Sequence, residues 1–390
     1  MGHAMDCKHI SDLVTPCLLI DKNRLLVNIE RMAQKANENG VALRPHIKTH
    51  KCMEIAEIQR EHGAEGLTVS TLDEAAIFAD AGFNDITYAV PITSNKISAA
   101  LAVSDRTELK LLVDSQFSIK VLNDRYREFG AIADVLLKVD CGYHRCGVNP
   151  QSNSSIKLVQ RIVDSSHLRF RGILTHAGHS YATRNSRQIE EIAHQEQQVM
   201  VDFANKLESE NKNFKPEVVS IGSTPTMSLS KYIMEGITEI RPGNYVFYDY
   251  SQVMLGSCKP EECALTVVAS VVGKYNDHLV IDAGATALSK DLGLIDKEGK
   301  QQFGKVYSNL DGDSFQTSLS IESLSQEHGK VGFKDPSSVA DIEISSMLRI
   351  LPNHSCLTAN LHDYYFILDD SEIVDKWQIR RDRPIISACL

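Results

Sequence analysis

The sequence predicts an α/β fold, a (β/α)8 barrel of the TIM type, followed by a second, mostly β domain. Up to about residue 258, eight short runs rich in valine and isoleucine alternate with longer helical patterns, which is the count of such a barrel. After about residue 260 the apolar runs follow one another without long helical patterns, which indicates a separate sheet. A doubly wound open sheet gives a similar rhythm, so the strand count alone leaves that alternative open.

The elements are expected in a fixed order along the chain. The barrel strands are VALRPHIK, GLTVST, ITYAVPI, LKLLVDS, VLLKVDCG, RGILTHAG, VVSIGST and EIRPGNY. The later strands are ALTVVASVVGKY, HLVIDAGATAL, DIEISSMLRILPNH and YYFILDD. The opening TPCLLID run precedes the first barrel strand, so we expect it to pair with the C-terminal sheet. We therefore place the barrel at residues 22–258 and the β domain at residues 5–21 and 259–390.

The composition is that of an ordinary globular enzyme. The 390 residues are 43% hydrophobic and 24% charged, which suffices for two domains. A formal net charge of −10 argues against a nucleic-acid partner, because phosphate contacts need a basic face. No apolar run is long enough to span a membrane, and the N-terminus lacks the apolar core of a signal peptide. Nine scattered cysteines suit free thiols in a reducing compartment, so we expect a cytoplasmic protein.

Polar side chains gather at the ends of the predicted barrel strands. In such barrels the chemistry lies at the C-terminal ends of the strands. Converging polar groups are costly to bury without a partner, so they predict a large polar ligand. These residues are Arg44, His46, Lys48, Ser70, Thr71, Asp114, Asp140, His144, Arg145, Thr175, His176, His179, Tyr181, Gly222, Ser223, Thr224, Arg241, Gly243, Asn244 and Tyr245.

Two glycine turns indicate where a phosphate would bind. SIGSTPTMS places Gly222, Ser223 and Thr224 at a strand-to-helix turn, where backbone amides and hydroxyls can hold an anion. RPGNY supplies a second turn, at Gly243, after the next strand. Loops after the last two strands often form phosphate sites in barrels. An ordinary helix N-cap with a turn glycine is the alternative for GST.

Several stretches, taken together, resemble one enzyme family. They are TPCLLID, LRPHIKTHK, GLTVSTLDEA, DCGYHRCGV, GILTHAGHSY, SIGSTPT, RPGNYVFYD, SQEHG and PNHSC, which run in order from near residue 15 to near residue 356. They are similar to the fold-type III, alanine racemase-like pyridoxal-phosphate enzymes, in particular the D-serine dehydratases and D-threonine aldolases. The resemblance implies that fold, pyridoxal 5'-phosphate as cofactor and a D-amino acid as substrate.

Lys48 is the residue on which the implied chemistry depends. It follows a buried strand that runs into a loop, where a lysine must pair with an anion or react. The resemblance matches it to the lysine that binds the cofactor's aldehyde covalently. A partly desolvated lysine near other cations loses its proton more readily and becomes a nucleophile. A loop lysine in a salt bridge is the alternative.

Three further residues are implied at the cofactor ring. The resemblance places Arg145 against the phenolic oxygen, Arg241 against the pyridine nitrogen and His176 beside the ring. An arginine at that nitrogen keeps it unprotonated and weakens the ring as an electron sink. A tyrosine from NYVFYDY is the alternative at the nitrogen, and a salt bridge at the barrel rim is the alternative for Arg145.

His179 and Tyr181 are expected within reach of the substrate, where they would act as acid or base. Hydrogen-bonded structural roles are the alternative for both. The expected catalytic residues are thus Lys48, His179 and Tyr181. The expected cofactor-binding residues are Lys48, His46, Arg145, His176, Tyr181, Gly222, Ser223, Thr224, Arg241, Gly243, Asn244 and Tyr245.

The PNHSC segment predicts a metal site. His354 and Cys356 stand two apart, so on a strand both side chains would point to one face. An imidazole and a thiolate suit zinc, with manganese or cobalt as alternatives, and two protein ligands leave positions open for water and substrate. A buried cysteine beside a structural histidine is the competing interpretation. Gln326, Glu327 and His328 lie in a loop that, in a head-to-tail homodimer of this family, would approach the partner's site. A solvated loop is the alternative.

The resemblance leaves two lyase reactions in competition. A dehydratase would release a keto acid and ammonia from D-serine or D-threo-3-hydroxyaspartate. An aldolase would release glycine and an aldehyde from D-threonine or another D-3-hydroxy amino acid. Cys356 favours the dehydratase, because aldolases of the family often carry aspartate there. An amino acid racemase and a non-catalytic pyridoxal-phosphate-binding protein are weaker alternatives, since neither has a task for a metal pair.

Overall fold

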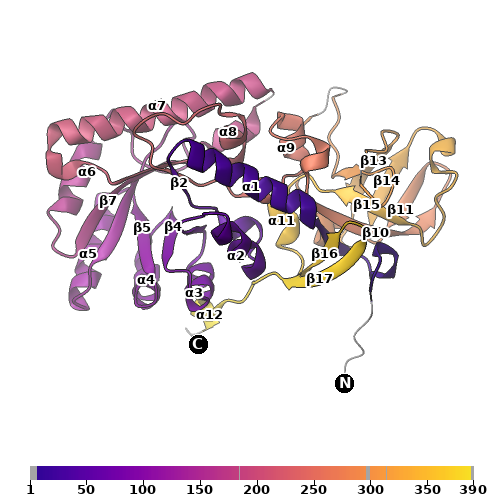
Figure 1. Cartoon of the computed structure of the whole chain (residues 1–390), viewed down its shortest axis with the longest axis horizontal. Helices are drawn as coiled ribbons and strands as arrows, with labels where there is room; N and C mark the ends of the chain where they lie inside the picture. The colour runs from indigo at the N-terminus through magenta and orange to yellow at the C-terminus, as the bar shows by residue number, and fades with distance from the viewer. Residues whose placement is uncertain (1–6, 184, 296–298, 313, 388–390) are drawn as a thin grey trace. The chain divides into compact units, whose positions relative to one another are not determined.

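The structure is a computed structural model that describes residues 7–183, 185–295, 299–312 and 314–387, and it divides into two compact units (Figure 1). The barrel unit consists of Arg31–Lys51, Ile55–Gly243 and Asp382–Leu390. The β unit consists of Met1–Glu30, Cys52–Glu54 and Asn244–Arg381. The domain boundaries expected from the sequence remain a prediction.

The barrel unit contains an eight-stranded parallel sheet, in the order β2-β9-β8-β7-β6-β5-β4-β3. Two isolated parallel bridges, Leu43 to Ala64 and His46 to Thr68, link the segments that carry the two outermost strands, so the sheet curves into a TIM-type barrel. All eight predicted strands are present in the predicted order, and the predicted fold class is confirmed. The strands are β2 (Ala42–Leu43), β3 (Leu67–Val69), β4 (Asp85–Pro91), β5 (Glu108–Val113), β6 (Ala133–Lys138), β7 (Leu168–Leu174), β8 (Val218–Ile221) and β9 (Glu239–Ile240).

Helices alternate with these strands, and Figure 1 shows α3, α4 and α5 beside the sheet. They begin where the sequence supplies caps. For example, Thr71 Oγ1 accepts the Glu74 N–H while the Glu74 carboxylate accepts the Thr71 N–H, a capping box that starts α3. The helices are α1 (Lys22–Glu38), α2 (Met53–Glu61), α3 (Leu72–Asp80), α4 (Ile97–Ser104), α5 (Gln116–Glu128), α6 (Asn153–Val163), α7 (Ser186–Glu210), α8 (Thr224–Leu229) and α12 (Pro384–Ser387).

The inside of the barrel changes from charged to apolar to cationic along the strands. Lys110 and Leu112 lie two apart on β5, and Leu136 and Lys138 lie two apart on β6, so each pair shares a face. Leu112, Leu136 and Leu174 pack into one buried cluster. Lys138 therefore stands beyond an apolar layer, at the C-terminal end of its strand.

Arg44 directly follows β2, as expected, but its guanidinium lies at the opposite, N-terminal end of this interior. Its guanidinium contacts the Glu239 and Asp85 carboxylates at 2.5 and 2.8 Å, and those residues begin β9 and β4. Lys110 also hydrogen bonds to Asp85. Arg44 is thus a structural cation of the barrel floor, and it does not belong to the candidate active site.

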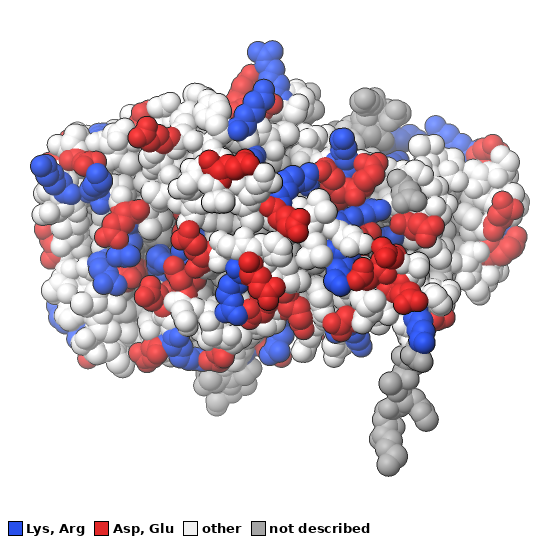
Figure 2. All heavy atoms as spheres, in the orientation of Figure 1, with Lys and Arg blue, Asp and Glu red and all other residues white. Residues whose placement is uncertain are grey.

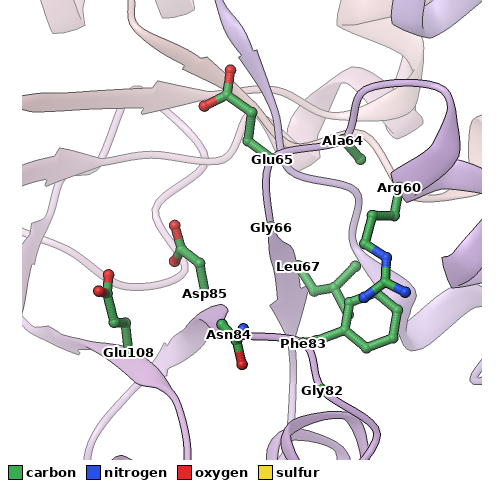
Figure 3. A pocket seen from close by; sticks show the side chains of 10 residues that line it. All are labelled: Arg60, Ala64, Glu65, Gly66, Leu67, Gly82, Phe83, Asn84, Asp85 and Glu108. Carbon is green, nitrogen blue, oxygen red and sulfur yellow. The ribbon is translucent and has the colours of Figure 1, made fainter.

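A cavity of about 330 Å³ opens at the same end of the barrel (Figure 3). The carboxylates of Glu65, Asp85 and Glu108 line it, and the Arg60 guanidinium lies 4.8 Å from the centre of the Phe83 ring. Because it lies at the starts of the strands, this cavity is not where barrel enzymes place their chemistry.

We expect Asp85→Asn to destabilise the protein by about 3 kcal/mol at neutral pH, because it leaves Arg44 and Lys110 without their shared counter-charge. Burial raises the pKa of Asp85, but Arg44 and Lys110 lower it by more than burial raises it. The net pKa is therefore below the ordinary aspartate value. The contribution is therefore present above about pH 4 and is lost as the pH falls through the lowered pKa.

Urea unfolding at several pH values measures this effect. The difference in unfolding free energy between the wild type and Asp85→Asn should shrink below about pH 4. Glu65→Gln, at an exposed carboxylate of the same cavity, should change stability by less than about 0.5 kcal/mol. Equal effects of the two substitutions would contradict the assignment.

The β unit contains a nine-stranded sheet. As expected, β1 pairs with this sheet, antiparallel to β10 and parallel to β16. The strands are β1 (Cys17–Asp21), β10 (Leu265–Lys274), β11 (His278–Ile281), β12 (Lys305–Val306), β13 (Leu319–Leu324), β14 (Gly329–Phe333), β15 (Met347–Leu351), β16 (Tyr364–Asp369) and β17 (Glu372–Gln378). Three short helices accompany them: α9 (Tyr250–Leu255), α10 (Ala285–Leu288) and α11 (Ser355–Ala359).

The surface mixes charges of both signs. Figure 2 shows lysine and arginine side chains interspersed with acidic ones on the face that it displays. No helix in the described part of the chain combines the length and the apolar character needed to cross a membrane.

Candidate active site

Lys48 lies in a 3-10 turn, η2 (Ile47–Thr49), shortly after β2. Its side chain is exposed in the chain alone, so the desolvation expected from the sequence is not seen there. The positive charge of Lys48 lowers the pKa of two neighbouring histidines, His46 and His176. Burial lowers the pKa of His46 well below its usual value, and Lys48 and Arg241 lower it further. His46 is therefore neutral at physiological pH.

His46 offers an unused nitrogen to a ligand. Its Nε2 lies 3.3 Å from Ser70 Oγ, while its buried Nδ1 has no hydrogen-bond partner among the described residues. His176 lies after β7, with Nδ1 3.3 Å from the Gly222 carbonyl oxygen. A buried polar atom without a partner is costly, so the arrangement around His46 fits a site completed by a bound group.

Lys138 is a further cation that the sequence reasoning missed. It ends β6 and is 4% exposed. Burial lowers its pKa to about 8, and Arg241 and Arg145 contribute to the same shift. The signal was present in the sequence, because a lysine interrupts the apolar run VLLKV. Its positive charge is also, after burial, the largest influence that lowers the pKa of His176.

Tyr143 links the predicted ring-binding residues and was also missed. Its ring stacks on His179 with centroids 6.1 Å apart and meets His176 edge-on at 6.2 Å. The Arg145 guanidinium lies 5.0 Å from the centre of the same ring. A Cβ at Gly178 would stand 2.3 Å from Tyr143 Cε1, so only glycine permits this packing. Four predicted or adjacent residues thus converge on one aromatic side chain.

His179 and Tyr181 lie on a 3-10 turn, η4 (Gly178–Ala182). Burial lowers the pKa of His179, and its buried Nδ1 has no hydrogen-bond partner among the described residues. Tyr181 is half-buried on the same turn. The structure therefore places both predicted acid–base residues on the loop that carries His176, at the C-terminal end of β7.

The GST turn is both an N-cap and an open hydroxyl site. Ser223 caps α8 by accepting the Thr226 N–H, as the alternative interpretation expected. Ser223 Oγ also lies 2.9 Å from Ser180 Oγ. Thr224 Oγ1, in contrast, is buried and lacks a hydrogen-bond partner among the described residues. The Thr224 hydroxyl is therefore available to hydrogen bond to an anion.

Glu196 on α7 holds this turn from behind, and nothing in the sequence distinguished it from the other acidic residues of that helix. One carboxylate oxygen accepts the N–H groups of Ala177 and Gly222, each at 3.1 Å, and the other accepts the Thr226 hydroxyl at 3.1 Å. Burial raises the pKa of Glu196, while the Gly222 N–H and Thr226 hydroxyl hydrogen bonds oppose the rise. Glu196 thereby ties the loop after β7 to the loop after β8.

Glu196→Ala should lower the unfolding free energy by about 2–4 kcal/mol, because three buried donors lose their acceptor. Glu196→Gln keeps an acceptor oxygen for the two N–H groups and should lose less. Guanidinium unfolding of the three proteins measures the order, with Glu190→Gln on the exposed face of α7 as the control. Equal stability of wild type and Glu196→Ala would contradict this role.

Arg241 is buried in the barrel interior, 4% exposed. Its Nε donates to Ser220 Oγ at 2.6 Å, and a second nitrogen donates to the Thr175 carbonyl oxygen. Burial lowers its pKa to about 10, and Glu239 and Glu196 limit the shift, so the guanidinium stays charged at neutral pH. Its contact with a pyridine nitrogen remains a prediction.

The barrel mouth fits an anionic aromatic cofactor. Lys48, Lys138, Arg145 and Arg241 all lower the pKa of His176, so the positive charges of four side chains act on this imidazole. Such an excess of positive charge calls for an anion. A ring that carries a phosphate and a phenolic oxygen would supply it, and Thr224 Oγ1 and His46 Nδ1, which lack partners among the described residues, could hydrogen bond to such a group.

The RPGNY turn divides between the two units. A Cβ at Gly243 would stand 2.7 Å from the His46 carbonyl oxygen, which requires glycine there. Asn244 and Tyr245 are buried on η6 (Asn244–Val246) in the β unit. There the Asn244 amide donates to the Asp249 carboxylate at 2.7 Å and to the Cys356 sulfur at 3.5 Å. The Asn244 side chain thus contacts the PNHSC segment.

The prediction that His354 and Cys356 share a strand is wrong. Strand β15 ends at Leu351, because the following Pro352 cannot donate to the ladder. His354 is the N-cap residue of α11, and Cys356 lies within that helix. The two side chains still meet, since a hydrogen bond to Cys356 contributes to the pKa of His354.

The pair has chemistry that fits a metal. Burial lowers the pKa of His354, but hydrogen bonds to Asp291 and Cys356 outweigh it and raise the pKa to about 11, so a metal would have to displace a proton from this imidazole. His354 Nδ1 lies 2.9 Å from the Asp291 carboxylate. In the described ranges no group of three or more His, Cys, Asp or Glu side chains forms a metal site. Imidazole and thiolate are nevertheless ligands that zinc prefers, and a catalytic metal needs open positions.

The SQEHG segment joins β13 to β14. Thr286 Oγ1 donates to the Gln326 carbonyl oxygen and to the Glu327 carboxylate, at 2.9 and 2.8 Å. Gln326, Glu327 and His328 are exposed in the chain alone. Their approach to a second subunit remains a prediction.

Comparison with known proteins agrees with this geometry. A family model described as alanine racemase, N-terminal domain, matches residues 20–251, and one described as putative serine dehydratase domain matches residues 264–368. The chain is 38% identical to D-serine dehydratase of Dictyostelium discoideum, over 95% of this chain and 97% of that one. It is 36% identical to D-threo-3-hydroxyaspartate dehydratase of Delftia sp., over 94% and 97%. It is 28% identical to D-threonine aldolase of Arthrobacter sp., over 94% and 92%.

Solved structures give the same result. D-threo-3-hydroxyaspartate dehydratase from Delftia sp. superposes with a TM-score of 0.89 at 34% identity, covering 96% of this chain and 100% of that one. A metal-free cysteine-to-alanine mutant of a protein of that name superposes equally well. The family predicted from the sequence is confirmed: the chain belongs to the alanine racemase-like, pyridoxal-phosphate-dependent lyases that include the D-serine dehydratases and D-threonine aldolases.

Proposed function

We propose that the protein is a D-3-hydroxy amino acid dehydratase that releases a keto acid and ammonia from D-serine or D-threo-3-hydroxyaspartate. The observation that carries this proposal is the contact between the His354 imidazole and the Cys356 thiol, two side chains that together suit a metal and would have no use in simple racemisation. The two dehydratases at 38% and 36% identity, against 28% for the aldolase, favour dehydration.

The barrel unit would hold pyridoxal 5'-phosphate, whose ring withdraws electrons from the bonds at the substrate's α-carbon. Lys48 would bind its aldehyde, Arg145 would face the phenolic oxygen and Arg241 the pyridine nitrogen. His176 and His46 would flank the ring. Ser223, Thr224, Gly222 and Gly243 would surround the phosphate. A role for Asn244 and Tyr245 in cofactor binding remains an expectation from the family resemblance.

His354 and Cys356 would hold a divalent metal, expected to be zinc, which as a Lewis acid makes the substrate's β-hydroxyl a better leaving group. Manganese and cobalt are the alternatives. The metal-free mutant structure of the related dehydratase supports a metal in this family. Asp291 and Asn244 already contact the two ligand side chains in the described chain.

The chain's own residues would move the protons. The Lys48 amine would act as the base for the α-proton. His179 and Tyr181, which lie on η4, would serve as acid–base residues for the substrate's oxygen. Because burial lowers the pKa of His179, its imidazole is neutral and can accept a proton at physiological pH.

The second candidate is an aldolase, which is supported by the 28% identity to D-threonine aldolase. Its chemistry would differ in one respect: a base removes the β-hydroxyl proton, and the bond between the α- and β-carbons breaks. The products would then be glycine and an aldehyde.

We also propose a cytoplasmic, head-to-tail homodimer. The free cysteines throughout the described residues support a reducing compartment. The exposed Gln326, Glu327 and His328 would approach the partner's site. Light scattering gives the mass, and a Glu327→Gln variant with altered substrate affinity and unchanged mass would support an approach in trans.

Product analysis tests the reaction. The purified protein, supplied with pyridoxal 5'-phosphate and zinc, is incubated separately with D-serine, D-threo-3-hydroxyaspartate and D-threonine. We expect keto acid and ammonia in equal amounts from at least one of the first two, and a loss of that activity in chelator. Glycine and aldehyde instead would establish the aldolase and show that His-x-Cys does not separate the two reactions.

A further inference from the structure

The segment that carries Asp291 lies against the PNHSC segment (residues 352–356) and the helix after it at three points. Asn353 Nδ2 donates to the Asp291 carbonyl oxygen at 2.8 Å. His354 Nδ1 lies 2.9 Å from the Asp291 carboxylate. Thr358 Oγ1 donates to the Leu288 carbonyl oxygen at 3.0 Å. Two segments about sixty residues apart in sequence are therefore fixed to each other around His354.

This attachment is tight. Asn353 is 1% exposed, and its amide also donates to the Gln302 carbonyl oxygen at 2.6 Å. A Cβ at Gly293 would stand 2.9 Å from Asn353 Oδ1, so glycine is required for the approach. The buried Asn353 side chain thus holds the Asp291 backbone in place. This fixes the direction in which the Asp291 carboxylate points, toward His354.

That direction determines which imidazole nitrogen can bind a metal. A carboxylate accepts, so the nitrogen facing it carries the proton. His354 Nδ1 faces Asp291, which leaves Nε2 for a ligand. A carboxylate on the far nitrogen fixes the ring orientation and raises the basicity of the metal-binding nitrogen.

We propose that Asp291 is a positioning residue for the metal site: through Nδ1 it orients His354 so that Nε2 binds the divalent metal. The inference rests on the proposed metal-dependent function and adds a residue that neither the sequence reasoning nor the comparisons assign. It predicts an effect on metal affinity that is separate from cofactor binding.

The test measures zinc affinity directly, without activity as the readout. Full-length protein carrying pyridoxal 5'-phosphate is freed of metal, and zinc is titrated in competition with a chromogenic chelator. Asp291→Ala should raise the dissociation constant for zinc about 10- to 100-fold, the usual cost of losing such a partner. The visible absorption of the bound cofactor should stay unchanged.

Two further variants make the result specific. Asp291→Asn keeps an oxygen that accepts from Nδ1, so it should bind zinc more tightly than Asp291→Ala. Asp277→Asn is the matched control, since Asp277 makes the same kind of contact with His278 Nδ1, at 2.7 Å, elsewhere in the β unit. It should bind zinc like the wild type.

Each other outcome overturns the inference in a distinguishable way. Wild-type affinity in Asp291→Ala shows that the carboxylate does not position His354. Equal losses in Asp291→Asn and Asp291→Ala indicate that Asp291 is itself a metal ligand, since an amide replaces a coordinating carboxylate poorly. Failure of the wild type to bind zinc, manganese or cobalt overturns the metal site and the proposed metal-dependent function together.

Discussion

Lys48→Ala should abolish the visible absorption of lysine-bound pyridoxal 5'-phosphate and lower kcat by at least about 10³-fold, the scale of losing an essential proton-transfer group. The proposed site contains a second amine, that of the buried Lys138, but this residue lies on β6 and not on η2. Stability should change by less than about 0.5 kcal/mol, because the Lys48 side chain is exposed in the chain alone. Absorption spectra, single-turnover kinetics and thermal unfolding measure the three expectations.

Lys51→Ala is the matched control for Lys48. Lys51 lies three residues further on, and its amine is 3.5 Å from the Glu74 carboxylate, so it has a structural partner. The variant should keep the cofactor spectrum and the activity. A cofactor still joined to a lysine in Lys48→Ala would show that another amine, with Lys138 the first candidate, binds the aldehyde.

Cys356→Ala should remove the metal and lower activity by at least about 100-fold, more than the loss expected for an outer partner. The cofactor spectrum should remain, because the predicted cofactor lysine lies in the barrel unit and Cys356 in the β unit. Metal analysis of the purified variant and assays with and without added zinc measure both effects.

Cys7→Ala controls for the loss of a thiol as such, since Cys7 is half-buried and hydrogen bonds only weakly to the Asp12 carbonyl oxygen. It should keep metal and activity. Full activity of the wild type in a strong chelator would contradict a metal role for Cys356.

The barrel was predictable because its signals are local. Each strand is a short apolar run that ends in polar residues, and caps such as the Thr71–Glu74 box mark where helices begin. The pairing of β1 with the second sheet followed from chain order, since that strand precedes the barrel's first strand. The paired turn residues Gly222 and Gly243 were visible for the same local reason.

What the sequence could not provide depends on contacts between distant segments. Strands β12, β13, β14 and β17 are short or carry many polar residues, so their apolar pattern is weak. Glu196 looks like any exposed helical glutamate until the Ala177 and Gly222 N–H groups are seen to point at it. A role for Asp291 becomes visible only through its contact with His354, and a role for Tyr143 only through its contacts with His176 and His179.

The His354–Cys356 geometry shows how a correct residue choice can come from an incorrect local structure. Spacing of two predicts a common face on a strand, yet Pro352 ends β15 and Asp249 accepts the Ser355 N–H to start α11. His354 is the N-cap residue, with extended backbone angles, and Cys356 lies in the first turn of the helix. Their side chains are in contact although the two residues do not share a strand.

A crystal structure of the protein grown with pyridoxal 5'-phosphate and zinc, with anomalous data at the zinc edge, would locate both groups. We expect density continuous with the Lys48 amine and a zinc peak about 2.0–2.3 Å from the His354 nitrogen and the Cys356 sulfur. Cofactor density joined to another lysine, or a zinc peak away from that pair, would contradict this expectation.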